Sequence, residues 1–158
     1  MHRRLVLLAL ALLTAACSPP LTVSQQIIHA IREMEARIEA GERREFMEFI
    51  ADDFSAQNER MNRDQVRALV VFQLRRYERL NGQLFPISVT ETAPDTAEAR
   101  FRALITGGPG WIPDSGQVYD FETWWRFEDG DWLLTSANWD EVPLDEVLDD
   151  IPLPTPDR

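Results

Sequence analysis

Lysine is absent from this sequence, cysteine occurs once and histidine twice. Without lysine the chain has no Schiff-base nucleophile, no phosphate-loop lysine and no serine–lysine dyad. A single cysteine excludes a disulfide within the chain. Zinc and other transition metals are held by clusters of cysteine and histidine, which this composition does not supply. We therefore expect neither a metal site nor a cofactor.

Basic residues are also few. The chain has 16 of them, all arginine, against 27 acidic residues, and its net charge is −11. Such a surface repels phosphate backbones, so nucleic acid is not expected as a partner.

The first residues differ in character from the rest of the chain. Arg3 and Arg4 precede an unbroken run of Leu, Val and Ala over residues 5–13, and the small residues Ala15 and Ala16 follow. A charged start, a short apolar run and small residues are typical of a secretory signal peptide. The run is far shorter than the roughly twenty residues that span a bilayer.

The phrase "LTAAC" ends this leader and contains the only cysteine, Cys17. It resembles the bacterial lipoprotein signal, which implies a lipid on Cys17 and cleavage before it. Thr14 departs from that signal, which usually has Leu at this position. The alternative is an ordinary cleavage near Ala16 with an incidental cysteine. We expect a signal peptide over 1–16, a lipidated tether over 17–23 and, because Ser18 follows the cysteine, an outer-membrane anchor in the cell envelope facing the periplasm.

The remainder has the length of one domain. Thr22 with Gln25 and Asn62 with Gln65 match the capping box that begins a helix. The spacing predicts a helix ending at Gly41, a shorter one that ends at "ADDF", and a third ending at Asn81-Gly82. Alternating apolar and polar residues then predict strands over 85–89, 97–105, 118–127 and 131–139, with a hairpin turn at "EDGD". The fold class is α+β, with three N-terminal helices packed on an antiparallel sheet.

Three phrases in this order are similar to the nuclear transport factor 2-like superfamily: "EAGERREFMEFIADDF", "PDTAEARFRALI" and "YDFETWWRFEDGDWLLTSANW". The resemblance implies a strongly curved sheet wrapped around the helices as a cone that is open at one end, and frequent dimers through the outer face of the sheet. We expect this domain over 24–142, with an acidic, proline-containing tail over 143–158.

Some members of this superfamily are isomerases, dehydratases or cyclases. At the positions that correspond to the isomerase tyrosine and aspartate, this chain has Met34 and Asn58, neither of which can act as an acid or base there. Glu59 lies beside the second position, and His29 is the one histidine outside the leader. We therefore expect no catalytic residue. The alternative is a small-molecule enzyme of isomerase, dehydratase or cyclase type that uses a pocket carboxylate or tyrosine.

The strand register suggests residues for a ligand pocket. Aromatic rings with a few hydroxyl groups suit an apolar ligand, and the candidates are Tyr119, Thr123, Trp125, Thr135 and Trp139, with Trp111 in the loop over the open end. The alternative is that these residues are plain core. Val118, Trp124, Leu104 and Leu134 are expected to face outward as an apolar surface for a homodimer or an envelope protein partner. The sequence thus predicts a lipid-anchored protein that binds a small apolar ligand or a protein partner.

Overall fold

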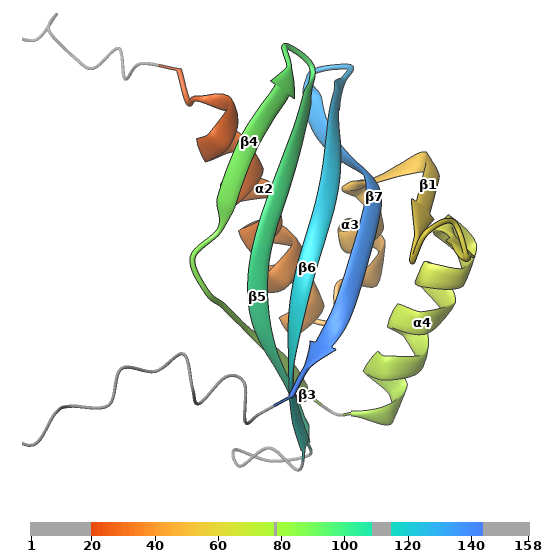
Figure 1. The fold of residues 1–158 in the computed structure, drawn as a ribbon. Helices are drawn as coiled ribbons and strands as arrows, with labels where there is room; N and C mark the ends of the chain where they lie inside the picture. Colours follow the sequence, from red (N-terminus) through yellow and green to blue (C-terminus); the bar gives the residue numbers. More distant parts are fainter. Residues whose placement is uncertain (1–19, 78, 109–114, 144–158) are drawn as a thin grey trace, which may run out of the picture.

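The computed structural model describes residues 20–77, 79–108 and 115–143. This part contains three helices and one sheet of seven strands (Figure 1). The helices are α2 (Val23–Glu39), α3 (Arg43–Glu48) and α4 (Arg63–Arg76). The strands are β1 (Ile50–Ala56), β2 (Met61–Asn62), β3 (Arg79–Leu84), β4 (Ser88–Ala93), β5 (Thr96–Gly108), β6 (Ser115–Glu128) and β7 (Asp131–Val142).

The sheet has the order β2-β1-β7-β6-β5-β3, and β4 pairs with β5 beside β3. Strand β5 is long enough to carry both neighbours on one edge, β4 along its first half and β3 along its second. Helix α2 contacts β3, β4 and β7, whereas α4 contacts β1 and β3. Figure 1 shows all three helices on the same side of the sheet, which leaves the other side of the sheet uncovered by helices.

The two predicted capping boxes are confirmed. The Thr22 hydroxyl accepts a hydrogen bond from the backbone of Gln25, and the Asn62 side chain accepts one from the backbone of Gln65. Helix α2 ends where predicted, because Gly41 takes a positive φ of 73° that glycine adopts without strain. The hairpin at Asp129-Gly130 also has positive φ angles at both residues, which the tight turn between β6 and β7 requires.

Replacing Asn62 by alanine is expected to lower the free energy of unfolding by about 1 kcal/mol, because the first turn of α4 loses its cap. The hydrogen bond from the Gln65 backbone N–H to Asn62 Oδ1 measures 3.0 Å. Urea denaturation of the wild type, Asn62→Ala and Asn62→Ser measures the effect, and serine should restore most of the loss. Equal stability of the alanine variant and the wild type would show that this cap contributes nothing.

Two features of the predicted fold were wrong. The helices are not all N-terminal, because β1 and β2 lie between α3 and α4, and "ADDF" belongs to β1 rather than to a helix end. The sheet is mixed rather than antiparallel, because β1 runs parallel to β7. Ile50 and Phe54 of β1 are buried, so this segment is held by packing against β7 and not by helical hydrogen bonds.

The third helix also ends earlier than predicted. Tyr77 takes an extended conformation after Arg76, and Asn81-Gly82 lies inside β3, where it pairs with β5. The predicted strand over 85–89 is instead the junction between two strands. Pro86 lies in this junction, where it donates no backbone hydrogen bond, and β4 begins at Ser88.

The core lies between the helices and the sheet. Its buried residues come from all three helices and from β1, β5, β6 and β7, and include Ile27, Ile31, Phe54, Trp125 and Leu134. None of the helices in the described ranges is long and apolar enough to cross a membrane.

Candidate functional site

A cavity of about 540 Å³ lies between the helices and the covered face of the sheet. Every helix and every strand except β2 and β4 contributes to its wall. The wall is largely apolar, and its aliphatic and aromatic members include Met34, Ile38, Phe54, Val70, Leu84, Phe101, Ile105, Phe121, Leu134 and Trp139. A concave apolar space of this size is typical of a site for a small molecule.

Four aromatic rings form one continuous side of the cavity across β5, β6 and β7. The rings of Phe101 and Phe121 stack with centroids 5.1 Å apart and planes 12° apart. Tyr119 and Trp139 tilt against Phe121 at 6.2 and 6.4 Å. Each ring therefore fixes the orientation of the next, and the wall they form is preorganised for a flat or apolar ligand.

The inner part of the cavity is closed to further hydrogen bonding. The Thr123 hydroxyl donates to the Ala99 carbonyl at 2.9 Å and accepts from Trp125 Nε1 at 2.9 Å. Thr123 and Trp125 are 4% and 2% exposed. Their polar atoms satisfy each other, so a ligand reaching this end meets apolar surface only.

Polar side chains gather at the opposite end, where the last turn of α4 meets β3, the end of β5 and the start of β6. These residues are Gln73, Tyr77, Asn81 and Gln117. Gln117 Nε2 donates to two backbone carbonyls, whereas Gln73 Oε1 is buried without a hydrogen-bond partner among the described residues. A buried acceptor without a partner is costly, so Gln73 is a polar group that the fold itself leaves unsatisfied.

At this polar end of the cavity, the ring of Tyr77 packs directly on Gly107 of β5. A Cβ placed on Gly107 would lie 2.7 Å from Cγ of Tyr77, which is closer than side chains approach. The guanidinium of Arg76 lies 5.4 Å from the centre of the same ring. Glycine at position 107 is therefore required for Tyr77 to lie flat on β5.

Two ionisable groups of the cavity wall have shifted pKa values. Burial raises the pKa of the Glu35 carboxyl, and the charge of Glu39 one turn later raises it further. The pKa of Tyr119 is raised mainly by burial and also by the charge of Glu141, which lies opposite it on β7. Both shifts are toward the neutral form, and the Tyr119 hydroxyl stays protonated and serves as a hydrogen-bonding group.

The structure brings together four of the predicted pocket residues. Tyr119, Thr123, Trp125 and Trp139 all line the cavity. Thr135 is not among the lining residues. The register of β6 and β7 shifts between Trp124 and Trp125, which leaves Thr135 as an extra residue whose hydroxyl donates to the Trp124 carbonyl. Trp111 and the lipidation candidate Cys17 lie outside the described residues.

The residues considered for catalysis are scattered. Met34 lines the cavity, whereas His29 is exposed on α2. Asn58 and Glu59 lie in the exposed turn after β1, where the Asn58 backbone N–H donates to Asn138. The isomerase positions therefore do not converge on the cavity. Within the described ranges no group of three or more His, Cys, Asp or Glu side chains is placed to hold a metal ion.

The cavity residues that the sequence reasoning missed include Glu35, Gln73 and Tyr77. A signal for them was present in the helical spacing. Glu35 follows Ile31 by one turn, and Gln73 and Tyr77 follow Val66 and Val70 by two turns. A polar side chain inside an apolar stripe marks a position that faces the interior.

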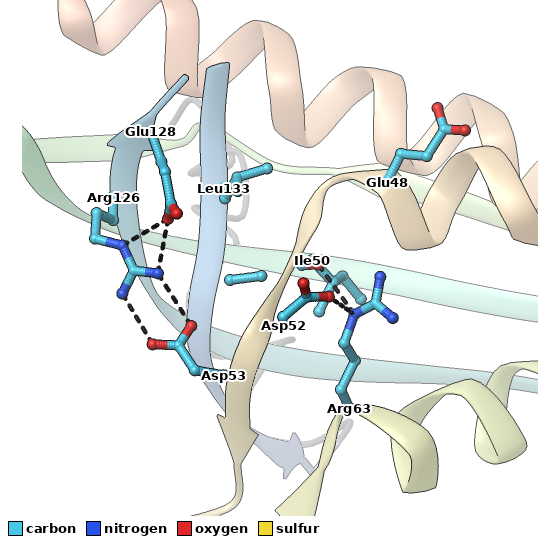
Figure 2. Close-up of a pocket in the computed structure, with 9 residues that line it drawn as sticks. Glu48, Ile50, Asp52, Asp53, Arg63, Arg126, Glu128 and Leu133 are labelled. Atoms are coloured by element: carbon cyan, nitrogen blue, oxygen red, sulfur yellow. Dashed lines mark hydrogen bonds and ion pairs between the residues drawn. The ribbon is translucent and has the colours of Figure 1, made fainter. Parts of the chain in front are cut away.

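A second, more polar pocket of about 420 Å³ lies on the surface beside β1 (Figure 2). Both carboxylate oxygens of Asp53 accept hydrogen bonds from Arg126 at 3.1 Å, and Glu128 accepts another from it at 2.9 Å. These bonds lower the pKa of Asp53. Arg63 donates to the Ile50 carbonyl at 3.1 Å. Both arginines thus hold β1 to its neighbours, so the polar residues of this pocket have a structural role.

The outer face of the sheet is charged. Arg102 pairs with Asp120 at 2.7 Å and Arg100 with Glu122 at 3.3 Å, as the cross-strand register predicts. The expected outward apolar surface was wrong in one of its four members, because Leu134 is buried and lines the cavity. Val118 is 3% exposed, and Trp124 donates its Nε1 hydrogen to Glu98. Leu104 and Trp124 are the half-buried apolar residues that remain there.

No protein-family model and no curated protein matches this sequence. Solved structures match its fold. A protein from Novosphingobium aromaticivorans, provisionally assigned as a scytalone dehydratase, has a TM-score of 0.67 at 10% identity, over 76% of this chain and 84% of that one. An uncharacterised cystatin-like protein from Caulobacter vibrioides has a TM-score of 0.65 at 18% identity, over 80% of this chain and 94% of that one.

Bd1075 from Bdellovibrio bacteriovorus matches with a TM-score of 0.64 at 10% identity. The match covers 75% of this chain but 40% of Bd1075, so this chain spans less than half of that structure. Identities this low show the fold and no more. The chain has the nuclear transport factor 2-like, cystatin-like fold, with helices on a mixed sheet.

Proposed function

We propose that this protein binds a small apolar molecule in the cavity between its helices and its sheet. The observation that carries the proposal is the 540 Å³ cavity with its stacked aromatic wall. Protein interiors are close-packed, and an unfilled apolar space of this size costs stability. A bound apolar ligand would supply the missing packing contacts. The ordered contacts among Phe101, Phe121 and Trp139 mean that little reorganisation is needed when a ligand enters.

We further propose that the protein is held at the bacterial cell envelope by a lipid on Cys17. The support is the leader, with its arginines, its short apolar run and the phrase "LTAAC". The domain follows within a few residues of Cys17, since α2 begins at Val23. The ligand-binding domain would therefore stay close to the membrane surface, facing the periplasm, where apolar molecules partition between lipid and protein.

A dye titration tests ligand binding. The chain from residue 18 onwards carries every helix and strand of the described fold. Phenylnaphthylamine is a neutral apolar dye that brightens when it leaves water, and it is expected to bind this domain with a saturable rise in emission. Ala103→Trp places an indole inside the cavity, opposite Tyr119, and is expected to weaken dye binding at least tenfold, which is a loss of about 1.4 kcal/mol.

The matched control is Leu104→Trp, which adds an indole on the outer face of the same strand. It should leave dye binding unchanged. Overpacking at Ala103 is expected to cost about 1–3 kcal/mol of stability, so circular dichroism must show that the variant is folded. If Val70→Trp, which enters the cavity from α4, and Ala103→Trp both bind the dye as well as the wild type does, the cavity is not the binding site.

Catalysis is the second candidate function, and one observation favours it. Glu35 lines the cavity and has a raised pKa, as a general base in an apolar site often does. Some solved structures with this fold carry provisional dehydratase assignments. Against this, the described cavity wall contains one carboxyl group and no histidine, so Glu35 lacks a second proton-transferring carboxyl or imidazole there. Binding without turnover is therefore the function that the geometry supports better.

A further inference from the structure

The described cavity wall contains an acidic side chain but no basic one. Among the described residues that line it, Glu35 has the only carboxyl group, and none is arginine or histidine. A ligand with a carboxylate or phosphate group would bring a buried negative charge into a space that offers it no cation, which is strongly unfavourable. The cavity therefore selects against anionic amphiphiles such as fatty acids.

The Glu35 carboxyl lies beside β3, where it makes a backbone hydrogen bond at Leu84, and no arginine or histidine lines the described cavity with it. Its Oε1 lies 3.3 Å from where a Cβ on Gly82 would be, so the absence of a side chain at Gly82 accommodates it. The backbone hydrogen bond at Leu84 and, to a smaller extent, the charge of Arg32 on the same helix lower the pKa of Glu35. Burial and the neighbouring Glu39 act in the opposite direction and dominate. The described cavity wall offers Glu35 no cation, and a cationic group on a ligand would favour the ionised form of its carboxyl.

Other groups of the wall are suited to the same cation. Gln73 Oε1 is a buried acceptor that has no hydrogen-bond partner in the described part of the chain. The rings of Tyr119 and Phe101 also line the cavity, and aromatic rings attract ammonium groups by cation–π interaction. The acidic surface of the whole chain also raises the local concentration of cations.

We propose that the ligand is an apolar molecule carrying a positively charged amine, with Glu35 as its counter-ion in the cavity. This inference rests on the proposed binding function and specifies its ligand class. The apolar body lies against the aromatic wall and the closed inner end, and the ammonium group donates hydrogen bonds to the Glu35 carboxylate.

Three probes that share one apolar body test this: naphthylmethylamine, naphthylmethanol and naphthoate, titrated calorimetrically at neutral pH into the chain from residue 18. In the wild type the amine is expected to bind about tenfold more tightly than the alcohol, because its ammonium group makes a charge-assisted hydrogen bond to Glu35. Naphthoate should bind more weakly than the alcohol. Glu35→Gln should bring the affinity of the amine down to that of the alcohol and leave the alcohol within about twofold of its wild-type value.

Glu39→Gln is the matched control. Glu39 lies one turn beyond Glu35 on α2 and accepts a hydrogen bond from the Gly82 backbone at 2.9 Å, but it does not line the cavity. This variant should keep the preference for the amine, which separates a contact with Glu35 from a general effect of the acidic surface.

The outcomes distinguish the two proposals. If the wild type binds the alcohol as tightly as the amine, or if Glu35→Gln keeps the preference, the amine inference is overturned while ligand binding stands. If none of the three probes binds, the binding function itself fails and the amine inference fails with it. The comparison of amine with alcohol in the wild type decides the question even if a variant does not fold.

Discussion

Replacing Trp125 by alanine is expected to lower the free energy of unfolding by about 3–5 kcal/mol, a large part of the total for a domain of this size. The side chain is 2% exposed and belongs to the core that joins β6 to α2 and β1. The loss has two parts, because the cavity enlarges and the Thr123 hydroxyl loses the hydrogen bond that Trp125 Nε1 donates. Urea denaturation followed by circular dichroism measures it.

Trp124 supplies the matched control on the same strand. It lies on the outer face and is half-buried, and its Nε1 donates to Glu98 at 3.1 Å. Trp124→Ala is expected to cost about 1 kcal/mol or less, as substitutions away from the core do. Trp125→Phe keeps an aromatic ring and removes the N–H, so its cost should lie between those of the two alanine variants. Equal costs for Trp124→Ala and Trp125→Ala would contradict the assignment of the inner face.

Replacing Cys17 by serine is expected to abolish lipid attachment and to move the protein from the membrane fraction to the soluble fraction. A serine hydroxyl would not form the thioether that the proposed lipid anchor requires, because the thiolate is the nucleophile. Two or three acyl chains bind a membrane firmly. Without them, the acidic protein has no comparable attraction to a membrane of anionic lipid. Incorporation of labelled palmitate and the intact mass of the protein measure the modification directly.

The control for this experiment is Thr14→Leu, which restores the residue that the lipoprotein signal usually has at this position. It should be lipidated at least as well as the wild type. The ordinary-cleavage alternative makes the opposite prediction, namely a wild-type protein that lacks residues 1–16 and carries no added mass. That result would remove the envelope anchor from the proposal and leave the cavity unaffected.

Helix starts and the three long strands followed from local sequence. Each capping box involves residues three positions apart, and the alternation over β6 is carried by one strand, so neighbouring residues contain the information. The parallel pairing of β1 with β7 could not be read in this way. Ile50 pairs with Leu134 and Ser55 with Ser136, far along the chain, and the segment between Ile50 and Ser55 bulges in a way that no local pattern records.

The cavity was predictable in part for the same reason. Tyr119, Thr123 and Trp125 follow from the alternation of β6, which pairs with β5 without a register shift. Thr135 was misplaced because the register shift between β6 and β7 adds one residue on β7, which changes the face on which later residues lie. Glu35 was not among the predicted pocket residues, because its place in the cavity depends on β3, which lies beside α2 only in the folded chain.

The parallel pairing of β1 with β7 has a consequence for how the chain reaches its folded state. Gln57 donates to the Trp139 carbonyl at 2.9 Å, and Leu134 donates its backbone N–H to Phe49 at 2.8 Å, so the first third of the domain is completed by its last strand. Contacts of such sequence separation form slowly, because a long loop must close first. The segment from α2 to β1 stays without its sheet partner until β7 has been synthesised.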